Sequence, residues 1–511
     1  MSNADPYDEV EYPGFPFPQT HPDRLATIAI LFGMTPKNVT ECRVLELGCG
    51  EGANLIPIAY GLPRSKFIGI DLAERAIARG TNALAALGLR NIELRRLNVL
   101  DVTADFGQFD YIIAHGLFSW VPLQVQEKIL TLCEDLLAPQ GVAYISYNTY
   151  PGSHLRQMTR EMMLFHLNAE TDPKIRLSKA RELIKSMSEA ETANDAYSAF
   201  LSQEFTRIAE RSDAALYHDD LGETNTAYYF SQFMEKARRH GLQYLAEARL
   251  AECQNNIYPA IANDLGVAHE DSIIASEQYF DFLKCRMFRQ TLLCHESVQV
   301  DRSLNIDRLR KLFVASSAQP VSATPDLQSP GVVEKFHLTS GATISIDLPV
   351  AKVALAYLGE VWPRSVGVEE LLARSHQHLC SRLDVGDSDS DMIGLCEAIL
   401  KIYGADLLYL HSYQQTIASS AGDDPIASPV ARLQARDKST VTTLRHTTVE
   451  LKDALGRHLL MLLDGTRNRP ALLEELSAQA KRQAGTPSKK VDLEDLERKL
   501  GELARLALLV A

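Results

Sequence analysis

The chain has no Cys-x-x-Cys pair, and its eight cysteines are scattered over 511 residues without grouping with histidines at zinc-ligand spacing. Disulfide frameworks and zinc sites both need cysteines at close, regular spacings, so neither is expected. Scattered cysteines are typical of reduced thiols in a cytoplasm. We therefore expect a cytoplasmic protein without a bound metal.

Basic residues are outnumbered, and long apolar runs are missing. The 52 lysines and arginines stand against 66 aspartates and glutamates, which gives a net charge of -14. Because phosphate backbones are held chiefly by basic side chains, this balance disfavours a nucleic-acid partner. No apolar run approaches the roughly 20 residues that span a bilayer, and the N-terminus carries acids and prolines where a signal peptide needs basic and then apolar residues. We expect no membrane insertion.

A glycine-rich turn follows an apolar run at residues 44–52, where the sequence reads VLELGCGEG. This pattern predicts a buried parallel strand that turns sharply into a helix. Glycines at positions Gly48, Gly50 and Gly52 let the backbone turn and approach a ligand closely. The turn is therefore a candidate cofactor seat, in which Cys49 is interpreted as a packing residue and not as a nucleophile.

Four later runs are also apolar and lead to a polar strand end: residues 67–71, 92–101, 109–115 and 142–147. Helices are expected between them over residues 73–88 and 122–137, the second ended by residues 138–141. Strands that alternate with helices predict a doubly wound α/β sheet. At the carboxyl edge of such a sheet, Asp71 is placed to accept two ribose hydroxyls, and Asp101 and Asn98 are placed at an adenine edge.

Prolines and aromatic residues alternate in the N-terminal stretch, residues 5–21. The stretch is too rich in proline for a helix or a central strand. A floppy leader is one interpretation; we favour a lid over the mouth of the cofactor site, where aromatic side chains cover adenine and exclude water. A helix from His21 to Phe32 is expected to follow.

Beyond the sheet, no further parallel-strand signal occurs. Helical spacing recurs at residues 155–167 and 175–187, and residues 217–313 are interpreted as a separate, mostly helical unit. Residues 314–331 and 419–429 have the composition of linkers. Short β runs with small helical packets after the first linker favour winged-helix-like modules, which in an acidic protein are interpreted as protein-interaction platforms and not as DNA-binding modules.

Several motifs occur together in one order. They are the proline–aromatic leader, Gln19–Leu25 (QTHPDRL), Leu45–Gly50 (LELGCG), Ala114–Pro122 (AHGLFSWVP) and Tyr147–Gly152 (YNTYPG). This set resembles the bacterial class I S-adenosylmethionine (SAM) methyltransferases with an appended methyltransferase regulatory domain, whose studied members include protein-lysine methyltransferases acting on outer-membrane protein. Segments 223–225 and 241–245 extend the resemblance into the regulatory part, and it continues to the C-terminus.

The resemblance implies an α/β fold with a Rossmann-like class I methyltransferase doubly wound sheet, followed by a mostly helical regulatory region and winged-helix-like C-terminal modules. The implied domains are a SAM-binding methyltransferase domain with an N-terminal lid (1–165), a helical connector (166–215), a methyltransferase regulatory domain (216–315), a middle winged-helix-like domain (332–415) and a C-terminal winged-helix-like domain (430–511). It implies SAM as the cofactor and a protein as the methyl acceptor. The oligomeric state stays open, with a homodimer among the options.

Site residues follow from the same resemblance. The implied cofactor-binding residues are Tyr7, His21, Glu46, Gly48, Gly50, Asn54, Asp71, Leu72, Asn98, Asp101 and His115. The implied catalytic residues are His115, Trp120, Asn148 and Tyr150. Taken singly, His115, Trp120 and Tyr150 are equally well explained as packing residues. Their joint position at the carboxyl ends of two adjacent strands favours the functional interpretation.

Methyl transfer from a sulfonium is an in-line displacement, so the protein mainly aligns the nucleophile and excludes water. A lysine amine, with a solution pKa of about 10.4, must first lose its proton. We expect an aromatic tunnel to lower that pKa by desolvation, while Asn148 orients the amine. The expected tunnel walls are Phe118, Trp120, Tyr147 and Tyr150.

Two alternatives remain open. The acceptor could be a small metabolite or a nucleic-acid base, although Asn148-Thr149-Tyr150-Pro151 departs from the Asn/Asp-Pro-Pro-Tyr/Phe pattern of amino methyltransferases that act on nucleic acid. The protein could also be a SAM-binding scaffold with vestigial chemistry. The large region beyond the sheet favours a macromolecular acceptor.

Overall fold

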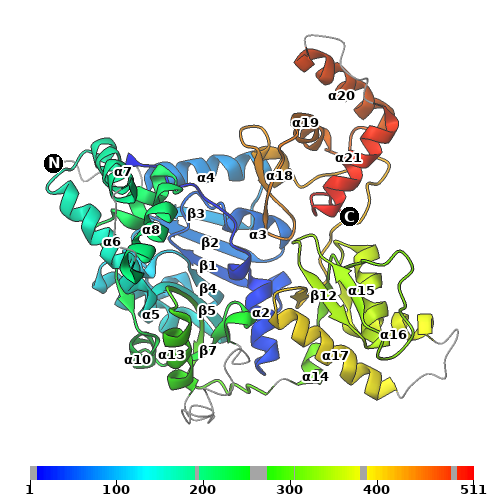
Figure 1. Cartoon of the computed structure of the whole chain (residues 1–511), viewed down its shortest axis with the longest axis horizontal. Coiled ribbons are helices and arrows are strands. Elements are labelled where there is room, and N and C mark those ends of the chain that lie inside the picture. Colours follow the sequence, from blue (N-terminus) through cyan, green and yellow to red (C-terminus); the bar gives the residue numbers. More distant parts are fainter. Residues whose placement is uncertain (1–8, 190–194, 254–272, 304, 380–387, 485–491) are drawn as a thin grey trace.

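One mixed sheet organises the chain. The computed structural model describes residues 9–189, 195–253, 273–303, 305–379, 388–484 and 492–511 (Figure 1). The sheet has eight strands in the order β3-β2-β1-β4-β5-β8-β7, with β6 paired to β5 off this path. The predicted Rossmann-like α/β class is confirmed. No helix among the described residues is both long and apolar enough to cross a membrane.

The first five strands are parallel, as predicted. They are β1 (Arg43–Leu47), β2 (Lys66–Asp71), β3 (Ile92–Arg96), β4 (Phe109–Ala114) and β5 (Leu137–Thr149). Strand β1 lies between β2 and β4, and Glu46 pairs in register with Gly69 on one side and Ile113 on the other. The carboxyl ends of the strands therefore meet along one edge, with Glu46 at its centre.

Helices connect these strands. They are α2 (Pro22–Leu31), α3 (Leu55–Gly61), α4 (Glu74–Leu87) and α5 (Leu123–Leu136), with single turns η1 (Pro18–Thr20), η2 (Val39–Glu41), η3 (Val99–Asp101), η4 (Ala104–Phe106) and η5 (Phe118–Trp120). Helix α4 ends at Gly88, whose φ of +66° is the left-handed C-cap that glycine favours. Helix α5 ends close to the predicted position, but strand β5 begins directly after it at Leu137, earlier than the predicted start at residue 142.

A helical cluster follows β5. Its elements are α6 (Gly152–Leu167), α7 (Pro173–Glu189), α8 (Ala196–Ala209), α9 (Asp213–Ala215) and η6 (Leu216–Asp220). Helices α6 and α7 occupy the segments where the sequence predicted helical spacing. Apolar residues of this cluster, including Met163, Phe205 and Ile208, form a small core of their own. The cluster is thus held mainly by its own packing and flanks the carboxyl edge of the sheet.

The next segment extends the main sheet. Its elements are β6 (Ala227–Tyr228), α10 (Phe230–Arg239), β7 (Leu242–Glu247), α11 (Leu250–Cys253), α13 (Ile273–Lys284) and β8 (Phe288–His295). Strand β8 is antiparallel to β5, and β7 is antiparallel to β8. Residues 217–313 are therefore not the separate unit that was predicted, because β7 and β8 extend the main sheet. The helices α10, α11 and α13 agree with the predicted helical content of the segment.

A mixed unit follows with two small sheets, ordered β10-β11-β12 and β13-β9-β14. Its elements are α14 (Ile306–Leu309), β9 (Phe313–Ala315), β10 (Gln319–Pro320), β11 (Glu334–His337), β12 (Thr343–Ile346), α15 (Pro349–Val361), β13 (Val366–Gly367), α16 (Val368–Leu379), α17 (Ser388–Gly404) and β14 (Tyr409–His411). Strands β9 and β10 fall in or against residues 314–331, so the linker predicted there is wrong. Two-residue and three-residue strands leave too short a pattern to separate from a linker.

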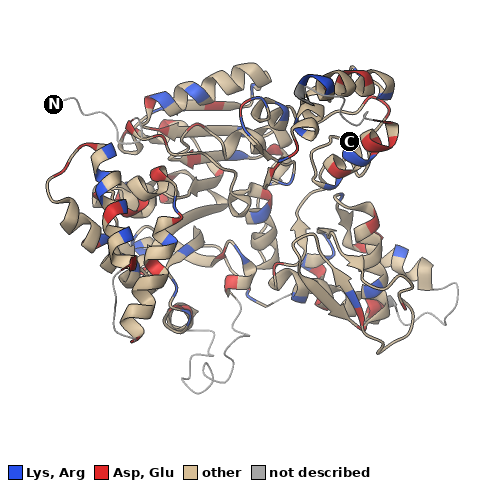
Figure 2. Cartoon of the chain, turned by 45° about the horizontal axis from the view of Figure 1, so that its top comes forward, with Lys and Arg blue, Asp and Glu red and all other residues tan. Residues whose placement is uncertain are grey.

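The C-terminal unit has its own leucine-rich core. Its elements are α18 (Pro429–Gln434), β15 (Thr440–Thr442), β16 (Thr448–Glu450), α19 (Ala454–Leu462), α20 (Arg469–Ala484) and α21 (Leu493–Arg505). Ile426 and Ala427 bridge to Asp464 and Leu509, so the linker predicted over residues 419–429 is part of this unit. Figure 1 shows the unit beside α3, and α18 contacts both α3 and α4. Acidic and basic residues are interspersed over the helices (Figure 2).

We expect Arg289→Ala to lower the free energy of unfolding by about 3–5 kcal/mol, because it leaves buried carboxylates without a partner. Arg289, in β8, is fully buried and pairs with Glu247, Glu277 and Asp281 at 2.6, 3.0 and 2.8 Å. Denaturant titration measures the change. The matched control is Arg239→Ala, whose side chain is 67% exposed and whose pair with Glu235 is worth less than about 1 kcal/mol. Equal losses in both variants would contradict the argument.

Candidate cofactor and acceptor site

The glycine turn after β1 has the backbone that its sequence predicts. Gly48, Gly50 and Gly52 have φ angles of +75°, +54° and +75°, which side-chain-bearing residues rarely adopt. The amides of Gly48 and Cys49 both donate to the carbonyl of Ile70, at 2.9 and 3.0 Å, and so fasten the turn to β2. Burial raises the pKa of the Cys49 thiol well above its usual value, which agrees with a packing role.

Asp71 holds the turn from the end of β2. One oxygen of its carboxylate accepts from the Gly50 amide at 2.8 Å, and the other accepts from the Ala73 amide at 2.9 Å. Each oxygen of a carboxylate can accept more than one hydrogen bond. The bonds from Gly50 and Ala73 therefore do not prevent Asp71 from accepting the two ribose hydroxyls. Next to Asp71, the Leu72 side chain is 50% exposed. Both residues therefore lie at the carboxyl end of β2, where the sequence predicts the ribose contact of Asp71.

Asn98 and Asp101 lie at the end of β3. The Asn98 side chain accepts from the Leu100 amide at 3.0 Å and caps the short turn η3. Asp101 closes that turn and is exposed. The turn thus presents a carboxylate at the edge of the sheet next to β2, which is the position expected for contact with an adenine amino group.

Glu46 is the buried acid at the centre of the edge. Its side chain is 4% exposed, and its Oε1 accepts from Asn54 Nδ2 at 2.8 Å. Its Oε2 is buried and has no hydrogen-bond partner among the described residues. Burial raises the pKa of Glu46 to about 8. An unsatisfied carboxyl oxygen in this position suits the ammonium group of an amino-acid ligand.

The neighbouring backbone leaves room for such a ligand. A Cβ built on Gly50 would meet no atom within 4 Å. An adenosyl ligand with an amino-acid arm therefore fits the residues present, with the amine at Glu46, the ribose at Asp71 and the adenine at Asn98 and Asp101. SAM has these three parts.

The proline–aromatic leader lies against this edge. The Phe17 amide donates to Asn54 Oδ1 at 2.9 Å, and the Phe17 ring lies 3.9 Å from the His115 ring between centroids. Gly14 passes so close to Ala53 that an added Cβ would lie 2.5 Å from the Ala53 Cβ. The aromatic segment thus covers the glycine turn from outside. Tyr7 lies outside the described residues.

His115 follows β4 and faces the leader. Its Nδ1 lies 2.8 Å from the hydroxyl of Tyr144, and its ring lies 6.3 Å from that of Phe288. Burial lowers the pKa of His115 to about 4. The imidazole is therefore neutral at physiological pH and acts as a polar aromatic contact.

The other implied catalytic residues have partners in the helical region. Asn148 Nδ2 donates to Asn225 Oδ1 at 2.8 Å. The Tyr150 ring stacks on His154 with centroids 4.0 Å apart, and the Arg156 guanidinium lies 5.8 Å from the Trp120 ring centroid. Trp120, Asn148 and Tyr150 thus each contact a residue that follows β5 in the chain.

Two expected tunnel walls are wrong. Phe118 and Tyr147 are fully buried in the apolar core under the sheet. Phe118 packs edge-on against Phe233 at 5.4 Å, and Tyr147 stacks on the same ring at 4.0 Å. They support the floor of the site and line no passage. Trp120 and Tyr150, both half-buried, remain as candidates for the acceptor side.

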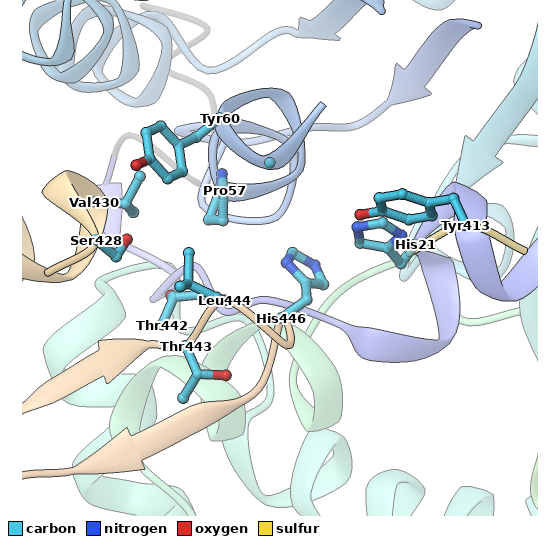
Figure 3. A pocket seen from close by; sticks show the side chains of 11 residues that line it. His21, Pro57, Tyr60, Tyr413, Ser428, Val430, Thr442, Thr443, Leu444 and His446 are labelled. Carbon is cyan, nitrogen blue, oxygen red and sulfur yellow. The ribbon is translucent and has the colours of Figure 1, made fainter. Parts of the chain in front are cut away.

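His21 lies against the C-terminal unit. Its Nδ1 accepts from the Asp23 amide at 3.1 Å, and its ring lies 5.5 Å from that of His446. Figure 3 shows both rings beside Tyr413 in a small pocket between the N-terminal segment, α3 and the C-terminal unit. These contacts place His21 between the N-terminal segment and the C-terminal unit, and its cofactor contact stays a prediction.

Sequence reasoning missed Phe17, Asn225 and His446. Phe17 belongs to the predicted lid, but nothing singled it out among four aromatic residues. Asn225 belongs to a motif that the resemblance already marked. His446 carried no signal, because it lies in a turn between two three-residue strands.

Comparisons with known proteins identify methyltransferase-related domains in successive parts of the chain. Family models match a methyltransferase domain at residues 45–143, a predicted methyltransferase regulatory domain at 212–295 and a PKMT C-terminal winged helix domain at 423–508. The uncharacterized protein RP789 of Rickettsia prowazekii is 31% identical over 485 residues, which cover 93% of this chain and 86% of RP789.

Solved structures extend the likeness to the whole chain. PKMT2 from Rickettsia typhi matches with a TM-score of 0.86 and 29% identity, over 98% of this chain and 100% of that one. The structure of PKMT2 in complex with AdoHcy gives 0.85 and 28% over the same shares.

The sheet and the adenosyl-binding edge define a class I SAM-dependent methyltransferase. The match to a PKMT winged helix domain and the full-length similarities identify the family within this class. The chain belongs to the PKMT family of SAM-dependent protein-lysine methyltransferases.

We expect Glu46→Gln to be more stable than the wild type at pH 8 but not at pH 5. The raised pKa means that the folded protein holds a proton on Glu46 that the unfolded chain, with a pKa of 4.5, releases. The free energy of unfolding therefore falls as pH rises from 4.5 to 8, by up to about 1.4 kcal/mol per pH unit, and glutamine removes this loss.

Thermal melts of the protein without cofactor measure the difference between variant and wild type at each pH. The control is Glu235→Gln, whose carboxylate is 66% exposed. If the difference in stability between Glu46→Gln and the wild type stays constant from pH 5 to 8, the pKa of Glu46 is not raised by folding and the argument is wrong.

Proposed function

We propose that this chain transfers a methyl group from SAM to lysine side-chain amines of a protein acceptor, which approaches beside Trp120, Asn148 and Tyr150. The observation that carries the proposal is the full-length likeness to PKMT2 of Rickettsia typhi, which has been solved with AdoHcy. The buried, unsatisfied oxygen of Glu46 supports use of the same cofactor.

When bound, SAM supplies an electrophilic methyl group. The residues of the chain then have to orient a neutral amine and exclude water. With a pKa lowered to about 4, His115 is too weak a base to take a proton from a lysine ammonium, whose pKa is about 10.4. We therefore assign loss of the amine proton to water at the entrance, and we assign to His115 the role of a polar wall beside the reacting centre.

An aromatic strip next to Tyr150 supports a protein acceptor. It consists of Tyr150, Tyr229, Phe282 and Tyr279, with successive ring centroids 5.2, 5.9 and 6.2 Å apart. Phe282 and Tyr279 are 48% and 42% exposed. Exposed aromatic groups that adjoin a site are typical of surfaces that bind another protein. We place the acceptor chain along this strip.

We expect Trp120→Ala to lower kcat by roughly 10- to 100-fold and Tyr150→Phe to lower it by about fivefold, with less than a twofold change in the Kd for SAM. Both changes disturb the acceptor side, where a small misplacement slows transfer strongly. Turnover assays and calorimetry measure the two quantities. Tyr197→Phe, at an exposed tyrosine of α8, is the matched control. Equal losses in turnover and in SAM affinity would exclude an acceptor role.

The acceptor class can be tested directly. The protein is incubated with methyl-labelled SAM and host lysate, and the label is located by mass spectrometry. Label on lysine side chains supports the proposal. Label confined to small molecules would assign a metabolite acceptor, and absence of label despite tight SAM binding would assign a scaffold.

A further inference from the structure

The turn between β15 and β16 carries a side chain from the C-terminal unit into the cofactor edge. His446 lies at its tip, is 4% exposed and has a φ of +58°. Thr443 and Thr447 close the turn, with the Thr443 amide donating to the Thr447 carbonyl at 2.8 Å and the two hydroxyls 2.8 Å apart. Figure 3 shows the His446 side chain projecting from this turn toward the N-terminal segment.

His446 joins the hydrogen bonds around Glu46. Its Nε2 lies 2.8 Å from Asn54 Oδ1, which also accepts from the Phe17 amide. A backbone amide can only donate, so the Phe17 contact fixes the carbonyl oxygen of Asn54 on this side and its NH2 group on the other. That NH2 group donates to Glu46 Oε1 at 2.8 Å. His446 Nε2 must therefore carry a proton and donate it.

We propose that His446 is a positioning residue for SAM binding: the C-terminal winged-helix domain, through His446 and Asn54, holds the Glu46 carboxyl in place for the cofactor. This inference rests on SAM binding alone and is independent of the lysine acceptor. It gives the C-terminal unit a direct part in the cofactor site, although His446 and Asn54 are 392 positions apart in the sequence.

The turn is itself anchored by two other parts of the protein. Arg445 donates from Nη1 to the Pro363 carbonyl at 2.9 Å, and its Nη2 lies 3.0 Å from His411 Nε2. His411 Nδ1 lies 2.6 Å from the Asp23 carboxylate at the start of α2. The Arg445 guanidinium lies 4.6 Å from the Trp362 ring centroid and 4.3 Å from that of Tyr409. The position of His446 is thus fixed by the middle unit and by α2.

The chemistry of His446 suits a constant donor. Burial lowers the pKa of His446 well below 6.5, and the nearby His21 lowers it further, so the ring stays neutral. Its Nδ1 is buried and has no partner among the described residues. Burying that nitrogen costs free energy. An apolar residue would avoid this cost, so the geometry favours a role for the proton on Nε2.

The test compares His446→Gln with His446→Met in the full-length protein. Both side chains have nearly the same length, but only glutamine can donate to Asn54 Oδ1. Calorimetry with SAM and with S-adenosylhomocysteine is expected to give a Kd raised roughly tenfold for His446→Met, and within about twofold of the wild type for His446→Gln. No acceptor is present, so the result is independent of the acceptor proposal.

Kinetic constants separate positioning from loss of structure. For His446→Met we expect the KM for SAM to rise with the Kd, while kcat at saturating SAM stays within about twofold of the wild type and melting temperatures of the two variants agree. His458→Ala, a histidine of α19 in the same unit, is the control. Equal Kd values for His446→Met and His446→Gln would overturn the proposal, as would a wild-type Kd for both.

A double-mutant cycle tests the route. If His446 acts through Asn54, adding His446→Met to Asn54→Ala changes the Kd for SAM by less than about twofold, because the link is already broken. A further tenfold loss in the double variant would show that His446 acts on the site by another path, and would overturn the assignment.

Discussion

The hydrogen bond from the Asn54 amide to the buried Glu46 carboxyl is the contact on which the cofactor edge depends. Burying a carboxyl group is costly unless its oxygens find partners, and the fold supplies one of the two. The other oxygen is left for a ligand. Asn54 in turn receives donors from the leader and from the C-terminal turn. The leader, the end of β1 and the C-terminal unit therefore share one side-chain amide.

The cofactor edge could be predicted because its residues are local in sequence. Glu46 and Asp71 lie in the last two residues of their strands, Asp101 lies in the turn after β3, and the glycine turn lies within six residues of Glu46. The parallel arrangement of strands β1 to β5 also follows from the alternation of strands and helices. The contacts Asn148–Asn225 and His446–Asn54 could not be predicted, because they join residues 77 and 392 positions apart, and Asn225 and His446 lie outside the helices and strands.

Errors on the acceptor side came from treating sequence neighbours as spatial neighbours. Side chains of a strand alternate between its two faces, so Tyr147 and Asn148 point in opposite directions. Tyr147 packs under the sheet against Phe233, whereas Asn148 meets Asn225 near the edge. The same applies to Phe118, which lies two residues before Trp120 but is buried in the core. The packing of Phe118 and Tyr147 against Phe233 of α10 makes them core residues, which the sequence alone does not show.

Strand β8 closes the sheet beside β5, and this order has a consequence for biosynthesis. The ribosome completes β5 at residue 149, but its hydrogen-bonding partner on the open side is made only at residues 288–295. Until then, the nascent chain carries a long apolar strand with unpaired backbone groups, which other chains can join. The main sheet is therefore complete only after residue 295 has been made. How long this edge of β5 stays open depends on how quickly the segment up to β8 emerges.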